Sequence, residues 1–254
     1  MDKEQARLAF ETYVAAYDAN NPRILLKSDH TLRVAKLCTR IAKGIGLGPQ
    51  DCDLAWLVGL LHDIGRFEQV RRYDTFNDSI SVSHAQLGAD LLFEDDRSLL
   101  RRFVLTSAHD QLIHAAVSLH SAYRLPDELD MKTRTFCNIL RDADKIDIIR
   151  VNRTCPIEDI YGVSAEQMRS SELSPTCIEH FYEHRCLPRG IRTYPADILL
   201  GHICFAWELV YPVSLKLLRE QGYLAEMLTQ RWELPQTQKD FDAMGRHMRE
   251  ALGI

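Results

Sequence analysis

A histidine and an aspartate stand side by side at His62-Asp63, at the end of an apolar run. The apolar residues between Asp53 and Ile64 have helical spacing, and we expect Gly65 to close this helix in the left-handed conformation. An imidazole beside a carboxylate suits a divalent transition metal, because imidazole prefers such ions and carboxylate prefers harder cations. The pair alone is also typical of a helix-terminal cap, so its function depends on partners elsewhere in the chain.

Other ionisable residues fall on the inward, apolar faces of predicted helices. His30 lies one turn before Val34 on the apolar stripe of a helix that we expect Ser28 to cap. Asp144 lies in register with Leu140 on a later helix. The remaining inward-facing residues of this kind are His84, which follows a capping Ser83, and His120, one turn beyond Ala116.

Burying this many ionisable groups costs free energy, and metal coordination is one way to offset that cost. One divalent ion held by His30, His62, Asp63 and Asp144 would have four protein ligands and room for water. Such an ion lowers the pKa of the bound water and yields a hydroxide nucleophile near neutral pH. His84 and His120 would complete a second site with Asp63 as the bridge, and two ions clamp the attacking and leaving oxygens in phosphoryl transfer.

Two other histidine arrangements fit less well. His109 and His120 fall on similar faces of one predicted helix, but eleven residues separate them by about 16 Å, so both cannot bind one cluster. His109 therefore stays an alternative ligand for the second site. His180 and His184 have the i, i+4 spacing of a helical metal half-site, but they lie off the buried stripe and have no evident third ligand.

The periodicity predicts an all-α fold, a helical bundle with additional C-terminal helices, because every strong segment is helical and none alternates like a strand. A polar stretch from Arg66 to Ser81 is expected to be a loop, whose length favours a binding element. We expect a metal-binding core at residues 1–155 and a helical extension at 156–254 that packs on it as one structural domain. Further helices are expected at 2–18, 98–107, 109–123, from 126, and at 175–185, 196–218 and 238–252.

Composition excludes several classes of protein. With 46% hydrophobic and 26% charged residues among 254, the chain is ordinary for a globular protein. Its net charge of −5 argues against binding to a nucleic acid polymer or an acidic membrane surface. The apolar stretch 196–218 is interrupted by His202, Glu208 and Pro212, so it is read as a kinked buried helix instead of a membrane span.

The cysteines and the first residues indicate a cytoplasmic protein. Seven cysteines, an odd number without a Cys-x-x-Cys pair, fit buried thiols in a reducing compartment better than a disulfide framework. The first residues, Met1-Asp2-Lys3-Glu4-Gln5, lack the apolar core of a signal peptide.

The order of these residues resembles a known family. His30, His62-Asp63 and Asp144 form the H…HD…D order of the HD superfamily of metal-dependent phosphohydrolases. The wider match, over roughly residues 25–150, resembles the H…HD…H…H…D variant of bacterial HD-type diadenosine tetraphosphate hydrolases and, more loosely, of cyclic-di-GMP phosphodiesterases of the HD-GYP type. Its blocks are His62-Asp-Ile-Gly-Arg66, His84-Ala-Gln-Leu-Gly88, Ala116-Val-Ser-Leu-His120 and Arg141-Asp-Ala-Asp-Lys145. Cyclic dinucleotide hydrolysis is disfavoured, because His120 is not one of a histidine pair and no Gly-Tyr-Pro follows.

The resemblance implies a helical core that binds one or two divalent ions: Mn, Fe, Co, Ni or Zn, with Mg as an alternative. It implies that the first ion is bound by His30, His62, Asp63 and Asp144, and the second by His84 and His120. Asp63, Arg66 and Lys145 are the expected catalytic residues, the two cations contacting substrate phosphate. Arg71 and Arg72 are weaker candidates on the same predicted loop, since arginine forks match phosphate oxygens.

The expected activity is hydrolysis of a small nucleotide or related phosphomonoester or phosphodiester by a metal-activated water. Two other functions stay open. One is a dinuclear-iron oxygenase of the same wider fold, and the other is a nucleotide-binding regulator whose metal site does not turn over. Apolar helices after residue 195 leave both packing against the first half and a homodimer open.

Overall fold

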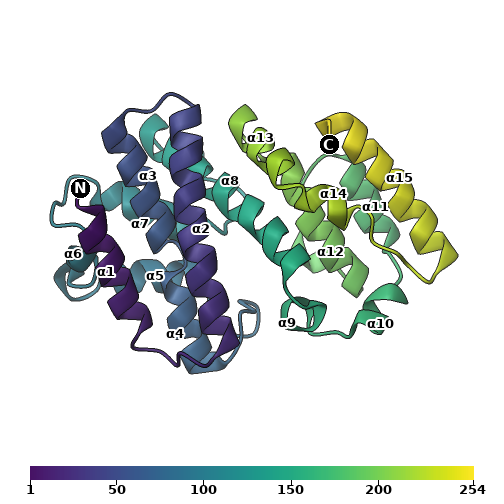
Figure 1. The fold of residues 1–254 in the computed structure, drawn as a ribbon, viewed down its shortest axis with the longest axis horizontal. Coiled ribbons are helices and arrows are strands. Elements are labelled where there is room, and N and C mark those ends of the chain that lie inside the picture. The colour runs from purple at the N-terminus through teal and green to yellow at the C-terminus, as the bar shows by residue number, and fades with distance from the viewer. The chain divides into compact units, whose positions relative to one another are not determined.

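The computed structural model describes residues 1–254, the side chain of Asp159 excepted. The described residues form helices and no strand, which confirms the predicted all-α fold. The chain divides into two compact units, Met1–Ala143 and Asp144–Ile254, and the division falls within helix α8 (Met131–Thr154; Figure 1). The predicted boundary at residue 155 and the predicted packing of the extension stay predictions.

The first unit holds a bundle of helices before α8. In this unit α2 and α3 lie side by side, and α5 packs against both α4 and α7 (Figure 1). Its helices are α1 (Lys3–Val14), α2 (Pro22–Gly44), α3 (Pro49–Leu61), α4 (Ile64–Tyr73), α5 (His84–Phe93), α6 (Leu100–Phe103) and α7 (Asp110–Leu119), with a 3-10 turn η1 (Asp95–Arg97).

Helix α2 begins earlier than the sequence suggested. Asn21 caps it, because its side-chain oxygen accepts a hydrogen bond from the backbone N–H of Arg23 at 2.9 Å. Pro22 follows in the first turn, where its fixed φ suits a helix and its missing N–H costs nothing. The predicted start at Ser28 is therefore wrong, and His30 lies inside a longer, better anchored helix.

The prediction for the segment after His62 is also wrong in detail. Helix α3 ends at Leu61, and α4 begins at Ile64 after a single break at Asp63, whose φ is −103° and ψ 18°. Gly65 lies within α4 and does not close α3. Residues 66–73, predicted as loop, are helical because Phe67 and Val70 are buried in the core. The loop itself runs over 74–83.

Gly65 has a different function, which is to let two helices approach closely. A Cβ atom at this position would lie 2.3 Å from the carbonyl oxygen of His84 and 2.6 Å from the backbone nitrogen of Gly88. Only a residue without a side chain fits there. The contact brings the start of α4, and with it Asp63, against the start of α5.

Three later predictions need correction. The helix expected at 98–107 is only the short α6, and α8 begins at Met131 with the Asp130 carboxylate accepting a hydrogen bond from the N–H of Thr133. The apolar stretch 196–218 is two helices separated by a 3-10 turn, since Pro212 starts a new helix in place of kinking the old one. Ser83 does cap α5, as predicted, by accepting from Gln86 N–H at 3.3 Å.

The second unit, by itself, consists of the last part of α8, from Asp144 on, and the helices that follow it. The elements that follow α8 are α9 (Ile157–Tyr161), α10 (Ala165–Arg169), α11 (Pro175–Tyr182), η2 (Arg189–Ile191), α12 (Pro195–Ile203), η3 (Cys204–Glu208), α13 (Pro212–Gln221), α14 (Tyr223–Met227) and α15 (Pro235–Leu252). Buried Asp197 accepts hydrogen bonds from the backbone N–H groups of Ser174, Thr193 and Tyr194, which joins the start of α11 to the start of α12.

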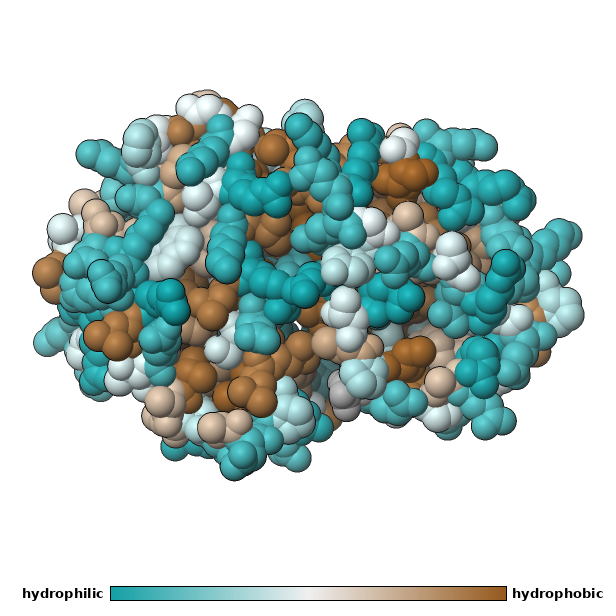
Figure 2. Space-filling view, in the orientation of Figure 1, coloured by the Kyte–Doolittle hydropathy of each residue, from teal (hydrophilic) through white to brown (hydrophobic). Residues whose placement is uncertain are grey.

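The face that Figure 2 shows is mainly polar. Hydrophilic residues cover much of the face in Figure 2, with hydrophobic residues in smaller groups between them. Among the described residues, no helix combines the length and hydropathy that crossing a membrane requires.

Replacing Gly65 tests the close approach of α4 and α5. Gly65→Ala places a methyl group against backbone atoms that cannot rotate away, so we expect the free energy of unfolding in urea to fall by about 2–3 kcal/mol. Gly190→Ala is the matched control, because a Cβ there has open space within 4 Å. Equal stability of the two variants would contradict the packing argument.

Candidate metal centre

His62 ends α3 with its imidazole in one defined orientation. The ring is fully buried, and its Nδ1 donates a hydrogen bond to the Gly59 carbonyl, three residues earlier, at 2.8 Å. With the proton held on Nδ1, the lone pair of the neutral ring lies on Nε2. The end of α3 therefore presents a ready metal-ligating atom.

His120 follows α7 in the same manner. Its buried Nδ1 donates to the Val117 carbonyl, again three residues earlier, at 2.7 Å. Two helix ends thus present histidine Nε2 atoms by the same backbone device. Their rings pack edge to face, with the centroids of His62 and His120 5.2 Å apart.

His84, the first residue of α5, is oriented by a carboxylate. Its Nδ1 donates to Asp78 Oδ2 at 2.6 Å, a carboxylate–histidine pair of the kind that supports metal ligands. Burial, and after it the charge of Arg66, lower the pKa of His84 to about 3, so the imidazole stays neutral at physiological pH. Its Nε2 lies 2.9 Å from Nε2 of His120.

The facing nitrogens of His84 and His120 fit a shared cation. The Nδ1 atoms donate elsewhere, to Asp78 and to Val117, so the two Nε2 atoms that face each other at 2.9 Å are the atoms left to bind a cation. When both rings are neutral, a cation beside the two nitrogens relieves the repulsion between their lone pairs. The donor set, neutral imidazoles with carboxylates, fits a divalent transition metal.

Asp63 lies at the centre, and its two carboxylate oxygens face different histidine pairs. Oδ2 is 3.6 Å from Nε2 of His30 and 3.4 Å from Nε2 of His62. Oδ1 is 3.6 Å from Nε2 of His84 and 3.7 Å from Nε2 of His120. Burial alone would raise the pKa of Asp63, but neighbouring cationic and hydrogen-bonding groups, Lys27 foremost, hold it well below the usual range. Each carboxylate oxygen therefore lies near its own pair of imidazole nitrogens.

Asp144 joins the cluster from α8, immediately after the last residue of the first unit on a continuous helix. One ligand atom each of His30, His62 and Asp144 lies within 4.8 Å of the others, and the same holds for His62, Asp63 and His120. The structure thus brings together all six residues that the sequence proposed as ligands. Their function as ligands stays a prediction.

Two residues near the centre escaped the sequence analysis. Lys27 donates to Asp63 Oδ2 at 2.7 Å. Its position three residues before His30 on α2 places both on one helix face, a signal that could have identified it. Asp78 lies in the loop 74–83, where no periodicity predicts which side chain turns inward.

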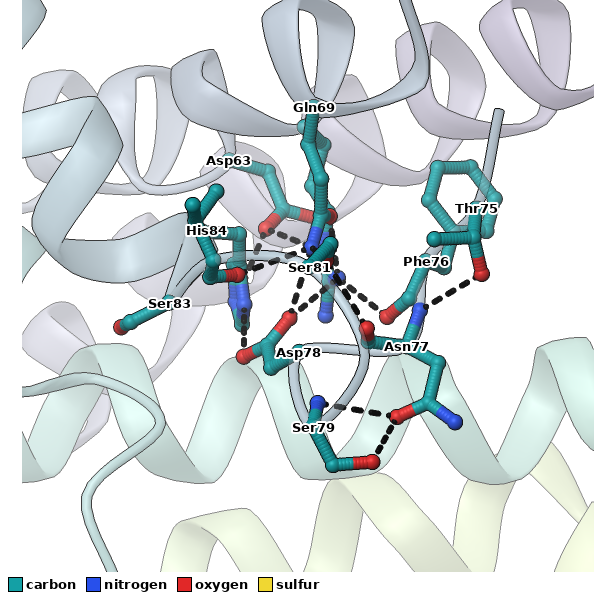
Figure 3. A network of polar contacts seen from close by, with 12 residues as sticks. Asp63, Gln69, Thr75, Phe76, Asn77, Asp78, Ser79, Ser81, Ser83 and His84 are labelled. Carbon is teal, nitrogen blue, oxygen red and sulfur yellow. Dashed lines mark hydrogen bonds and ion pairs between the residues drawn. The ribbon is translucent and has the colours of Figure 1, made fainter. Parts of the chain in front are cut away.

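Asp78 also fastens its loop to α4 (Figure 3). Its Oδ1 accepts from Arg66 Nη1 at 2.9 Å and from Gln69 Nε2 at 3.0 Å. Arg66 Nη1 donates in addition to the Phe76 carbonyl at 2.6 Å. One carboxylate therefore holds His84 through one oxygen and the loop through the other.

The predicted catalytic cations differ in their surroundings. Arg66 Nη1 is engaged with the loop, while its buried Nε has no hydrogen-bond partner and lies 3.7 Å from Asp63 Oδ1. Lys145 is half-buried, one residue after Asp144 on α8. The substrate contacts expected of both stay predictions.

The weaker candidates lie elsewhere. Arg71 and Arg72 are exposed and both bind the carboxylate of Glu68, so they neutralise this buried acid on α4. His109 precedes α7 instead of lying within a longer helix, and it lines a surface pocket next to Asp110.

Removing the Asp78 charge tests its support of His84. We expect Asp78→Asn to weaken binding of the second ion about 10–100-fold, because the imidazole loses the anion that fixes it. The measurement is the Kd of Co²⁺ by competition with a chromophoric chelator. The control, Asp74→Asn, makes the same change in the same loop, at a carboxylate that pairs with surface Arg23. Matching Kd values for the two variants would refute the role of Asp78.

Comparison with known proteins agrees with this geometry. The family model of the HD domain matches residues 28–149, a range that includes all six clustered residues. No curated protein and no solved structure matches the chain. Residues 28–149 are therefore an HD domain, the domain of a superfamily of metal-dependent hydrolases.

Proposed function

We propose that this protein is a metal-dependent phosphohydrolase acting on a small nucleotide or a related phosphate mono- or diester. The observation that carries the proposal is Asp63, whose two carboxylate oxygens each face a separate pair of histidine Nε2 atoms. That arrangement suits two neighbouring divalent ions, the pattern typical of in-line phosphoryl transfer.

The protein's own part in the reaction is to orient ligands and exclude water. Divalent ions, when bound, activate water as a nucleophile and stabilise negative charge on phosphoryl oxygens. Backbone carbonyls hold the tautomers of His62 and His120, and Asp78 holds that of His84. The ligand residues His30, His62, Asp63, His84 and His120 are all at most 5% exposed, so their electrostatic interactions act in a shielded environment.

Two cations beside Asp63 favour an anionic substrate. Lys27 Nζ and the Arg66 guanidinium carbon lie 5.4 and 5.5 Å from the centre of the Phe76 ring, and their side chains are 16% and 11% exposed. They line the side of the centre next to the loop 74–83. A phosphate group is expected to approach there, while the net charge of −5 disfavours a long polyanion.

Metal removal and restoration test the activity. We expect the chelated protein to hydrolyse none of a panel of nucleoside phosphates, dinucleoside polyphosphates and other phosphate esters. Adding back Mn²⁺, Co²⁺, Ni²⁺, Zn²⁺ or Mg²⁺ one at a time should restore hydrolysis with at least one of them. Released phosphate and chromatographed products give the readout.

Asp63→Asn tests the bridging carboxylate. We expect kcat/KM to fall by roughly three orders of magnitude, about 4 kcal/mol of transition-state stabilisation, because an amide cannot bridge two cations. Asp53→Asn is the matched control on α3, where the carboxylate pairs with Lys3 at the surface. Retained activity in Asp63→Asn would exclude the proposed centre.

Other results would select the alternative functions. Nucleotide binding without turnover, under every metal, would favour a regulator. Oxygen consumption by the ferrous protein, with no phosphate released, would favour an oxygenase.

A further inference from the structure

Two histidines of the second unit meet outside the HD domain. His184 lies two residues beyond the end of α11, and His247 lies on α15. Their Nε2 atoms are 2.6 Å apart, although 63 residues separate them in the chain. The i, i+4 pair of His180 and His184 does not form, because α11 ends at Tyr182 and the His180 ring turns to Glu183 at 3.1 Å.

The His184 ring is held firmly for an exposed side chain. Its backbone has φ of +56°, a left-handed conformation that residues other than glycine rarely adopt without local compensation. The ring stacks on Trp207, with centroids 4.1 Å apart and planes inclined by 12°. On the other side of the pair, the His247 ring packs against Tyr182 with centroids 5.1 Å apart. Aromatic contacts thus support both rings of the pair, whose Nε2 atoms lie next to each other.

We propose that His184 and His247 bind a transition-metal ion such as Zn²⁺, Ni²⁺ or Cu²⁺ at the surface of the second unit. Imidazole nitrogens are preferred ligands of these ions, and His184 is exposed while His247 is half-buried. Water completes the coordination. The ion joins the end of α11 to α15 and so crosslinks two distant segments of this unit.

The competing explanation is a single proton shared between the rings. Two neutral imidazoles form one N–H···N hydrogen bond, which needs no metal. Counting bound ions distinguishes the two explanations, because only the metal site adds an equivalent beyond those of the HD domain.

Equilibrium dialysis of the full-length chelated protein against Ni²⁺ provides that count. We expect His184→Gln and His247→Gln each to bind one equivalent fewer than the wild type. His180→Gln is the matched control, a neighbouring histidine with a different partner, and it should keep the wild-type number. Equal numbers in all four proteins would overturn the proposal.

Trp207 gives a local and independent signal. Paramagnetic Ni²⁺ bound at His184 should quench the fluorescence of Trp207. The quenching at Trp207 is the difference between the quenching of the wild type and that of Trp207→Phe. We expect the quenching at Trp207 to vanish in His247→Gln and to persist in His180→Gln. Quenching of Trp207 that survives in His247→Gln would also overturn the proposal.

Thermal stability separates lost binding from lost folding. Without metal, His247→Gln should give the helical circular dichroism of the wild type, since His247 is only half-buried and glutamine suits a helix. Ni²⁺ should raise the Tm of wild type and His180→Gln more than that of His247→Gln, because binding stabilises only the folded site. The same Tm increase in all of them would contradict a crosslinking ion.

Discussion

The structure of the HD domain depends on where three imidazoles place their Nδ1 protons. His62 and His120 donate them to carbonyls three residues earlier, and His84 donates to Asp78. Each bond fixes a tautomer and a ring plane, and so directs an Nε2 lone pair inward. Asp63 remains an ionised carboxylate in this buried site because Lys27 and neighbouring hydrogen-bond donors hold its pKa well below the usual range.

The position of Asp63 beside the histidines depends on close packing between the backbones of α4 and α5. Gly65 packs against the backbone of His84 and Gly88 in α5. This contact brings the break at Asp63 close to the start of α5 at His84. A larger residue would separate the carboxylate from the second histidine pair while leaving both helices intact. The loop 74–83 completes the arrangement, because Asp78 reaches His84 and Arg66 at once. The contact between α4 and α5 and the hydrogen bond from Asp78 in the loop therefore both position His84.

Sequence reasoning identified the helical fold and the six clustered residues because each lies on an apolar stripe or at a stripe's end. It misplaced Gly65, since a glycine after a helix has two uses, a left-handed cap and a close contact, and only the three-dimensional neighbour decides between them. It missed Asp78 because loop side chains follow no period. Lys27 could have been predicted from the sequence, because a residue three positions before His30 lies on the same helix face.

The histidine pairs of the two units illustrate why spacing alone is a weak guide to metal sites. His180 and His184 had the spacing of a half-site, but the helix ended between them, and His184 met a residue from the far end of the chain. In the HD domain the ligands also come from separate helices, and adjacency in sequence matters only at His62-Asp63. In both sites a second contact orients the imidazole. In the HD domain the contact is a hydrogen bond from Nδ1 to a carbonyl or a carboxylate, and at His184 it is stacking on the indole of Trp207. Rotational restraint of the ring lowers the entropy lost on binding, and it is the property that distinguishes a candidate ligand from an ordinary histidine.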